Sequence, residues 1–513
     1  MLSDIAGFLK KYKSSILIAM MFVLLCYGFM LTHYTLQIDE ETWINNSDPQ
    51  LIKTIWISQG RFGLYIFDRI FSPLGRYIPI LWDILAVIIY FFSGFIFLFS
   101  FSHIKKDFSK FAAFTFLCVF PALPFVTGDF LSFSMFNFQQ ALAMLVMSIS
   151  FLCTIIYFRG KKKRHICLSI IFAFISVSFF QAFAVVYVTA VTAYFLLALL
   201  SGKYKKKEIV KNTLYSFIIF IVFITMYFVV NIILNNIYSL SNAPHASGYI
   251  GWSDNIKDNF LYTLLGAGKV ILGYDIIGGT AILITEAVFI ALSVILVIKQ
   301  KGTVNRLFLG AAFLIFFISP FLMNFALLNW RFLGRILLAF SLTLALELFL
   351  FADYASKLKW SKILSYVIVC IILLINAGSM NMLFYNNYLS YKADKELAAS
   401  IIAELKEKHI NYESVPILFV GHIESATKAG DYVQSSSFFN WDEGNNNRMH
   451  DFFKAEGYTT VKTPNELKTL GIELSKDMPC WPSHESVKSF DSLIIVKFSD
   501  PSDKWFIING VDK

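Results

Sequence analysis

Charged residues are scarce in this chain of 513 residues, where Asp, Glu, Lys and Arg together make up 15%, against about 25% in average soluble domains. Cysteine is also rare, with 6 residues and no Cys-x-x-Cys pair, so neither a zinc site nor a disulfide framework is predicted. The Walker A, Gly-x-Gly-x-x-Gly, His-Glu-x-x-His and Gly-x-Ser-x-Gly patterns are absent. These absences argue against the common nucleotide-binding and hydrolase designs.

Hydrophobic residues, by contrast, make up 57% of the chain, 55 residues are Phe, and the mean hydropathy is +0.62. A water-soluble protein of this size could not bury so much apolar surface. The composition therefore excludes a soluble globular protein, a disordered chain, collagen and a coiled coil. It predicts an α-helical polytopic membrane protein.

Apolar runs long enough to cross a bilayer recur along the chain, since a span needs about 20 residues. The first is expected to remain as an anchor, because its apolar core is too long for a signal peptide and no Ala-x-Ala site follows. We predict eleven spans, at 15–36, 78–101, 111–127, 135–158, 166–181, 183–200, 211–235, 277–299, 307–323, 333–352 and 363–383.

Basic residues cluster between these runs, and Lys and Arg in short loops favour the cytoplasmic side. The net charge of +9 is therefore read as a membrane orientation signal. All basic loops can share one side only if 166–200 forms a helical hairpin that turns near Gln181. The prediction is a cytoplasmic N-terminus and an outer C-terminus, with basic loops at 10–13, 103–110, 159–164, 203–207, 299–306 and 357–362.

The segments predicted to lie outside carry structure of their own. In the loop 35–77, Asp48 and Pro49 resemble a helix start, and the apolar spacing that follows predicts one or two amphipathic interfacial helices. Segment 254–274 is a further candidate. The polar tail predicts a small α/β domain, with a helix at 392–409 and buried strands at 416–420 and 492–496. We expect two domains, a membrane domain over 1–385 and an extracytoplasmic one over 386–513.

Three outer constellations could carry chemistry. Ile38-Asp39-Glu40-Glu41 follows the first span, and such carboxylates can act as general base, metal ligand or cation partner, or can simply be a solvated acidic loop. Gln59-Gly60-Arg61, with Arg69 and Arg76 after it, suits a phosphate, although snorkelling to lipid headgroups is the alternative. Asn329-Trp330-Arg331-Phe332-Leu333-Gly334-Arg335 is expected to place two arginines on one helical face, paired with Asp39 or Glu40 or with a substrate phosphate.

Single residues are weaker candidates. Asp129, in a short outer turn, is more often a turn residue than a catalytic one. Gln181 is expected to cap backbone rather than touch a ligand, and His245 is expected to be incidental.

The cytoplasmic loops are all too short to hold a nucleotide-sugar or ATP domain. An enzyme of this design would have to take its activated donor from the lipid or from the outer face. A lipid-phosphate donor fits, because its phosphate would meet arginine while a carboxylate deprotonates the acceptor hydroxyl.

The order of these motifs, with Pro320 and the tail elements Asn447-Arg448, Asp451-Phe452-Phe453 and Met478-Pro479, resembles the GtrII-type glucosyltransferase family of the GT-C glycosyltransferase superfamily. The resemblance implies a polyprenyl-phosphate-linked sugar donor, expected to be glucose. It further implies a bacterial surface polysaccharide such as O antigen as the acceptor, an inner-membrane location, and a catalytic carboxylate in the first outer loop.

Carried over to this chain, the resemblance implies Asp39 as the base, with Glu40 as the close second, and inversion at the sugar. The expected phosphate-binding residues are Arg61, Arg331 and Arg335. The expected substrate contacts are Glu41, Trp43, Gln59 and Asp129. A divalent ion, Mg²⁺ or Mn²⁺, remains open, with Asp39, Glu40 and Asp129 as oxygen donors.

Three other functions compete with this one. A lipid-linked oligosaccharide flippase would also have many spans and internal charges, but its charges would lie at mid-membrane. A polysaccharide polymerase or ligase would share the outer face and the lipid phosphate. A scaffold that presents the tail would need no carboxylate at Asp39.

Overall fold

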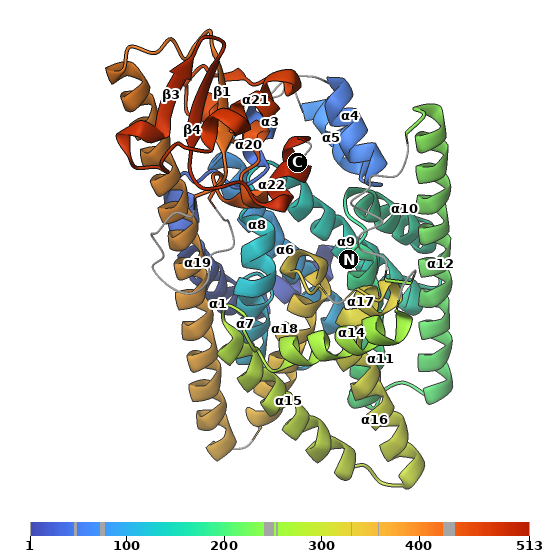
Figure 1. The fold of residues 1–513 in the computed structure, drawn as a ribbon. Coiled ribbons are helices and arrows are strands. Elements are labelled where there is room, and N and C mark those ends of the chain that lie inside the picture. Colours follow the sequence, from blue (N-terminus) through green and yellow to red (C-terminus); the bar gives the residue numbers. More distant parts are fainter. Residues whose placement is uncertain are drawn as a thin grey trace. The chain divides into compact units, whose positions relative to one another are not determined.

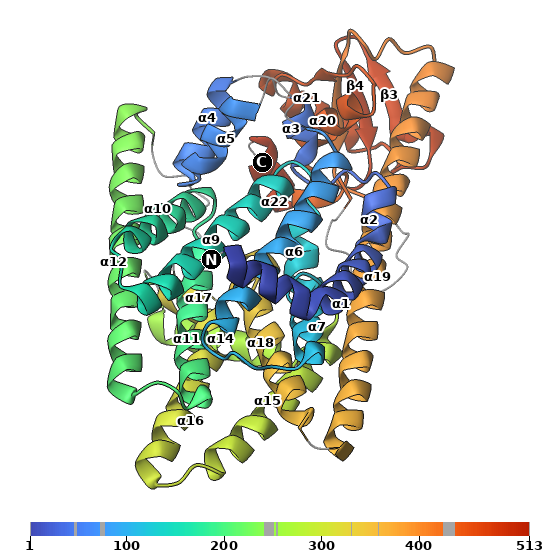
Figure 2. The ribbon, with the colours of Figure 1, turned by 180° about the vertical axis from the view of Figure 1, so that it is seen from behind.

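A computed structural model describes residues 2–45, 49–71, 77–240, 251–252, 255–329, 331–357, 359–423 and 437–511. The chain divides into two compact units (Figures 1 and 2). Unit 1 comprises Met1–Thr32 and Asp48–Asn381, and unit 2 comprises His33–Ser47 and Met382–Lys513. The first predicted outer loop is thus shared, because its acidic segment groups with the tail while its amphipathic part groups with the helices of unit 1.

Unit 1 is built from helices. Their bounds are α1 Leu2–Cys26, α2 Gly28–Thr32, α4 Pro49–Ser58, α5 Phe62–Phe71, α6 Leu81–Ser102, α7 Lys110–Val119, the π-helix η2 Pro124–Gly128, α8 Asp129–Leu131, α9 Asn137–Gly160, α10 Arg164–Phe179, α11 Phe183–Ser201, α12 Lys206–Ile237, α14 Ile256–Ile271, α15 Gly279–Ile298, α16 Thr303–Ile318, the 3₁₀-helices η3 Ser319–Phe321 and η4 Gly334–Ile336, α17 Leu322–Leu327, α18 Leu338–Ala355 and the first half of α19 Lys359–Glu407.

Within the described residues, nine helices are long and apolar enough to cross a membrane. The predicted helical membrane architecture is therefore confirmed in kind. The count of eleven spans differs at two places. α10 has only 16 residues, and α1 carries Lys10, Lys11 and Lys13 within its length and ends at Cys26, before a second short helix.

Burial separates central helices from peripheral ones. The apolar window of α18 is 89% buried, whereas that of α12 is 17% buried, and α12 stands at the edge of unit 1 in both views (Figures 1 and 2). Large apolar side chains such as Leu214, Phe217 and Ile232 are exposed along α12. A helix with satisfied backbone hydrogen bonds and an apolar exterior is stable in lipid, so α12 has the surface of a lipid-facing span.

The six basic loops lie at one end of unit 1. Lys11 pairs with Asp107 at 3.6 Å, and Arg159 donates a hydrogen bond to His103 Nδ1 at 2.6 Å. The hydroxyl of Tyr204 donates to the carbonyl of His103 at 3.4 Å. The remaining links are Lys206 to Asn305, Lys299 to the Tyr354 hydroxyl, and Lys105 to Asp353.

The same end is visible in Figure 1, where the connection between α15 and α16 and the starts of α12 and α19 lie at the bottom of unit 1. The basic loops before α10 and after α11 can share this end only if the two helices form the predicted hairpin. They do, with residues 180–182 between them. A common end for the basic loops is what the parity argument from the sequence required.

Both segments predicted to contain amphipathic helices do contain them, with three helices in all. The amphipathic pattern after Pro49 forms α4 and α5, and the segment 254–274 contains α14. The predicted N-cap Asp48 lies outside the described residues, as do Arg76, His245 and Trp330.

Unit 2 contains a four-stranded sheet of order β2-β1-β4-β3. The strands are β1 Pro416–Val420, β2 Val461–Lys462, β3 Val487–Phe490 and β4 Leu493–Lys497. β1 pairs in parallel with β2 and β4, while β3 and β4 are antiparallel. The predicted strands correspond to β1 and β4, whose apolar runs are buried on both faces, as central parallel strands require.

Short helices complete unit 2, namely α3 Glu40–Asn45, η5 Trp441–Glu443, α20 Asn446–Ala455, α21 Asn465–Ser475, η6 His484–Ser486 and α22 Asp503–Asn509. Leu418, Val420, Leu493, Ile495 and Trp505 form a buried core against the sheet. A mixed sheet with helices around it is the α/β arrangement predicted for the tail.

The helix predicted at 392–409 is not separate. α19 runs without a break over 49 residues, from Lys359 to Glu407, so the last predicted span and the predicted tail helix are one element. The intervening stretch Phe384–Tyr391 contains no Pro or Gly, and nothing in it interrupts the backbone hydrogen bonds. The change in polarity there marks a change of environment and not the end of a helix.

Candidate functional site

The acidic segment folds as a tight turn that leads into α3 of unit 2. Asp39 has a φ of 82°, in the left-handed region that Asp tolerates better than most residues. The backbone N–H of Glu40 donates to the carbonyl of Gln37 at 3.1 Å, and Glu40 Oε2 accepts from the backbone N–H of Gln37 at 2.9 Å. The turn therefore holds Asp39 in a backbone conformation that sets the direction of its side chain.

Arg448 is the cation at this site. It lies in the first turn of α20, where the side chain of Asn445 caps the helix and accepts from the backbone N–H of Arg448 at 3.3 Å. The guanidinium binds Glu41 through Nη1 and Asp39 Oδ1 through Nη2, the latter at 2.9 Å, and Asp442 lies 3.9 Å from Nη2. One planar fork thus bridges two of the three predicted carboxylates.

The three carboxylates differ in exposure. Glu40 and Glu41 are fully buried, whereas the side chain of Asp39 is 57% exposed. Glu41 Oε2 has no hydrogen-bond partner in the described part of the chain. Burial raises the pKa of Glu41 to about 7, although Arg448 opposes the shift. Asp39 is consequently the most exposed carboxylate of the three.

α3 is fastened to α20 by more than the ion pairs. Asn45 Nδ2 donates to the carbonyl of Asp451 at 2.5 Å. Trp43, expected to contact the sugar, is only 9% exposed, so most of its indole surface is used in packing. Glu40 and Glu41 are likewise held inside unit 2.

The sequence analysis did not assign a role to Arg448. The only signal was Asn447-Arg448 among the tail motifs of the resemblance, because no spacing along the chain relates Arg448 to Asp39, which is 409 residues away. The sequence analysis instead offered Asp39 or Glu40 as partners for Arg331 and Arg335. The structure pairs Asp39 with Arg448.

In unit 1 the Gln59-Gly60-Arg61 turn joins α4 to α5. Gln181 Nε2 donates to the carbonyl of Gln59 and to the hydroxyl of Tyr227, both at 2.8 Å. The Tyr227 hydroxyl donates to the carbonyl of Gly60 at 3.0 Å. The predicted capping role of Gln181 is confirmed, and it fixes the backbone beside Arg61.

Arg61 and Arg335 border the same aromatic chain. The guanidinium of Arg61 lies 4.8 Å from the ring of Phe180 and 6.0 Å from Trp56. The guanidinium of Arg335 lies 5.9 Å from Phe133. The rings of Trp56 and Phe136 are 6.4 Å apart, and those of Phe136 and Phe133 are 5.5 Å apart. Two cations therefore flank a row of three rings.

Asp129 belongs to this part of unit 1. It is buried at the end of the π-helix η2, and its Oδ2 accepts from the backbone N–H of Arg335 at 3.1 Å. Gly334 permits the approach, since a Cβ there would lie 1.8 Å from the carbonyl oxygen of Phe125. Asp129 thus holds the backbone that carries Arg335.

The expectation that Arg331 and Arg335 share one helical face is wrong. Residues 331–333 are not helical, Gly334–Ile336 is a 3₁₀ turn, and α18 begins only at Leu338. Side-chain amides hold the irregular stretch, because Asn324 Nδ2 donates to the carbonyl of Arg331 at 3.2 Å and Asn329 Oδ1 accepts from its N–H at 2.8 Å. Local amide hydrogen bonds compete with helix formation here.

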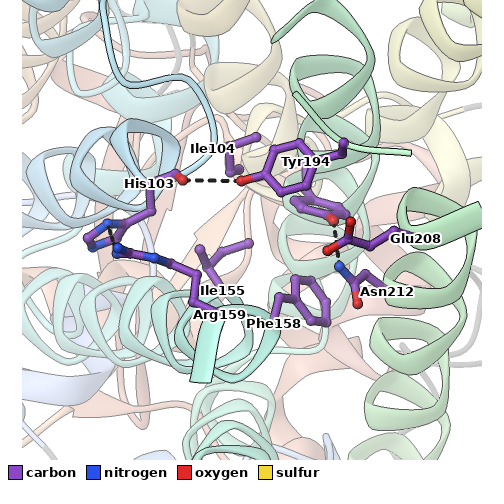
Figure 3. Close-up of a pocket in the computed structure, with 9 residues that line it drawn as sticks. His103, Ile104, Ile155, Phe158, Arg159, Tyr194, Glu208 and Asn212 are labelled. Carbon is purple, nitrogen blue, oxygen red and sulfur yellow. Dashed lines mark hydrogen bonds between the residues drawn. The ribbon is translucent and has the colours of Figure 1, made fainter. Parts of the chain in front are cut away.

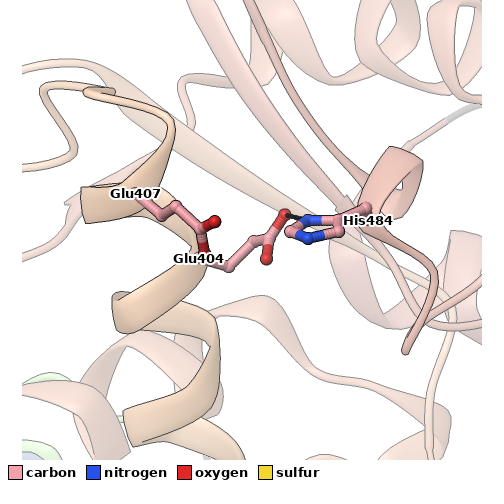
Figure 4. A group of neighbouring side chains, drawn as sticks. All are labelled: Glu404, Glu407 and His484. Carbon is pink, nitrogen blue, oxygen red and sulfur yellow. Dashed lines mark hydrogen bonds and ion pairs between the residues drawn. The ribbon is translucent and has the colours of Figure 1, made fainter.

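A second group of titratable side chains lies elsewhere in unit 2. Glu404 and Glu407 of α19 face His484, and Figure 4 shows the bond between Glu404 and His484 Nδ1. Lys408 also pairs with Glu404 at 3.0 Å. Because a lysine and a histidine already compensate Glu404, this group has the character of a surface link between α19 and η6. The divalent ion considered for Asp39, Glu40 and Asp129 stays a prediction.

Comparison with known protein families shows which family the chain belongs to. The family model described as glucosyl transferase GtrII matches residues 28–329, more than half of the chain. The chain therefore belongs to the GtrII glucosyltransferase family and is a glycosyltransferase by family. No curated protein matches it. The match includes Asp39, Arg61 and Asp129 and ends before Arg335 and Arg448.

Proposed function

We propose that this protein transfers glucose from a polyprenyl-phosphate donor to a hydroxyl of a bacterial surface polysaccharide, such as O antigen. The observation that carries the proposal is Asp39, an exposed carboxylate in a left-handed turn within the matched region 28–329. Arg448, which lies outside that region, orients its side chain. Residues held in sparsely populated backbone conformations cluster at functional sites.

In the proposed reaction Asp39 is the general base. It accepts the proton of the acceptor hydroxyl while that oxygen attacks the anomeric carbon of glucose. The new oxygen–carbon bond forms as the bond from carbon to the phosphate oxygen breaks, which inverts the configuration. Arg448 binds Oδ1 of Asp39, so the second carboxylate oxygen is the one that takes the proton.

The leaving group is the polyprenyl phosphate. Its negative charge grows as the bond breaks, and guanidinium groups that are already oriented stabilise such charge. Arg335 and Arg61 are assigned this role, supported by their positions on the aromatic row, and Arg331 is assigned to it by its neighbourhood to Arg335. Glu41, Trp43, Gln59 and Asp129 are the further residues that we assign to substrate binding or to holding the site.

The proposed location is the bacterial inner membrane. The basic end of unit 1 would face the cytoplasm, in accord with the positive-inside rule, and unit 2 would be extracytoplasmic. Glu40 accepts a hydrogen bond from the backbone N–H of Gln37, so we assign it to holding the turn. Asp39 is the first candidate for the base and Glu40 the second.

The test is transfer of labelled glucose from synthetic polyprenyl-phosphate glucose to an acceptor polysaccharide by the purified full-length protein. Asp39→Asn removes the base but keeps a residue that tolerates positive φ, so turnover should fall about 10²- to 10⁴-fold. Arg335→Gln removes the positive charge and should reduce turnover by about 10²-fold or more. The backbone hydrogen bond to Asp129 does not depend on the side chain and remains. Asp258→Asn and Arg164→Gln, both exposed, are the matched controls.

Equal turnover by Asp39→Asn and Asp258→Asn would remove Asp39 as the base. If Glu40→Gln or Glu41→Gln alone abolished transfer, the role would pass to that residue. A wild-type protein that consumes no polyprenyl-phosphate hexose but moves lipid-linked oligosaccharide across vesicles would be a transporter.

A further inference from the structure

Unit 1 contains a cavity of about 280 Å³ among the ends of α6, α9, α11 and α12, away from the residues assigned above (Figure 3). Ligand pockets usually span about 300–1,000 Å³, so this one suits a ligand of headgroup size. It opens between the basic loops 103–110, 159–164 and 203–207.

One wall of the cavity is cationic. Arg159 donates to His103 Nδ1 at 2.6 Å, and the Tyr204 hydroxyl donates to the carbonyl of His103 at 3.4 Å. Burial, with help from Arg159, lowers the pKa of His103 to about 4, so the imidazole is neutral and accepts the bond from Arg159. The wall therefore carries one positive charge with oriented N–H donors.

The opposite wall carries one negative charge. Glu208, Asn212 and Tyr194 lie across the cavity from Arg159 in Figure 3. Asn212 Nδ2 donates to the Tyr194 hydroxyl at 2.9 Å, and Asn212 Oδ1 accepts from Lys161 at 3.2 Å. Arg159 and Glu208, both described, form no ion pair with each other, although Glu208 interacts electrostatically with Lys161. Both charges border the cavity, so a ligand that spans it can meet both.

The floor is apolar and buried. Ile104 and Ile155 are each 2% exposed and Phe158 is 8% exposed. Charged groups at the rim above an apolar floor match the level at which phospholipid headgroups meet acyl chains, where lysine and arginine at helix ends also lie.

We propose that this cavity binds the headgroup of a phospholipid that joins a phosphodiester to a primary ammonium, that is, a phosphoethanolamine lipid. Arg159 binds the phosphate oxygens, and Glu208 binds the ammonium. The site lies at the basic end of unit 1, and its occupancy does not depend on the proposed glucosyl transfer.

Native mass spectrometry of the full-length protein from nanodiscs tests the proposal, with phosphatidylethanolamine, phosphatidylcholine and phosphatidylglycerol in equal amounts. The wild type should retain phosphatidylethanolamine in excess over the other two. Glu208→Gln should abolish the preference over phosphatidylcholine, whose ammonium cannot donate hydrogen bonds. Arg159→Gln should weaken the retention of phosphatidylethanolamine and of phosphatidylcholine by about tenfold, since charge-assisted contacts with the phosphate are lost.

Matched controls are Asp107→Asn and Arg164→Gln, exposed residues of the same loops, which should retain lipid like the wild type. If Arg159→Gln unfolds, Arg159→Lys keeps the positive charge but loses the planar fork of the guanidinium, and it should still lower retention. Equal retention of phosphatidylglycerol, or an unchanged preference in Glu208→Gln, would overturn the proposal. Saturation by free phosphoethanolamine with no retained lipid would overturn it in favour of a soluble ligand.

Discussion

At the scale of single residues, Arg448 determines the state of the acidic segment. Its two terminal nitrogens bind Asp39 and Glu41 together, which the single ammonium of lysine cannot reproduce with the same geometry. Asp39 gains an orientation and Glu41 gains a counter-charge. Because Glu41 is buried, its carboxylate needs a cation, and Arg448 of the tail provides it.

Glu41 predicts a pH dependence of the stability of unit 2. Its pKa is about 7 when folded against an ordinary 4.5, and burial likewise raises the pKa of Asp394 from 3.8 to about 7. An acid whose pKa is higher in the folded state than in the unfolded state stabilises the fold when it is protonated. This stabilisation is fully present below the pKa of the unfolded state and is lost as the pH rises through the pKa of the folded state. Stability of unit 2 should therefore fall between about pH 4.5 and 7, by roughly 1.4 kcal/mol per pH unit for each group.

Pulse proteolysis of the full-length protein in urea, followed through fragments of unit 2, measures this slope. Glu41→Gln and Asp394→Asn should each remove one part of the pH dependence of the free energy of unfolding. In the double variant that free energy should hardly change over this range. A slope in Glu41→Gln equal to that of the wild type would show that Glu41 is ionised throughout.

At the scale of elements, the turn between α4 and α5 is the most constrained connection beside the arginines. Gly60 has a φ of 71°, and a Cβ there would lie 2.3 Å from the Tyr227 hydroxyl and 2.7 Å from Gln181 Nε2. The turn can form only with glycine. Its contacts with Gln181, between α10 and α11, and with Tyr227 of α12 set the position of Arg61.

Gly60→Ala should displace Tyr227 and Gln181 and thereby move Arg61. We expect transfer to fall by tenfold or more, with a loss of stability on the order of 1–3 kcal/mol. Gly310→Ala is the control, because a Cβ at this helical glycine of α16 meets nothing within 4 Å and should be neutral or slightly stabilising. Initial rates and apparent melting temperatures of both variants in detergent provide the comparison, and wild-type rates for Gly60→Ala would contradict the argument.

At the scale of the whole molecule, two buried acids lie inside the long apolar helices of unit 1. Glu286 of α15 and Glu347 of α18 are 2% and 0% exposed. Glu286 Oε2 and both carboxyl oxygens of Glu347 have no hydrogen-bond partner within the described residues. Burying such a polar group without partners is unfavourable, so the pair reduces the stability of the helical core.

Glu347→Leu should therefore raise the apparent melting temperature of the full-length protein, by a few degrees if the gain is about 1–3 kcal/mol. Glu347→Gln removes the acid but keeps a polar amide, and it should raise the temperature less. A gain in stability together with a loss of transfer would indicate that the acid is kept for function. A lower melting temperature in Glu347→Leu would show that the carboxyl is well solvated or paired.

Much of the fold follows from local pattern. Apolar runs between basic loops locate most helices, and the parity of those loops predicts the α10–α11 hairpin. Continuous apolar stretches locate β1 and β4, and the amphipathic spacing locates α4 and α5. These features depend on periodicity and composition, which act over a few turns of chain, so the sequence by itself determined them.

The tertiary structure alone decided the partners of the candidate site residues. The pairing of Arg448 with Asp39 joins positions 409 residues apart, and the bond from Arg335 to Asp129 depends on a close approach at Gly334. It also decided that the acidic segment belongs to unit 2 and that α19 continues past its apolar half. The physical reason is that ion pairs and backbone approaches are set by which elements pack together, and no local period along the chain records that packing.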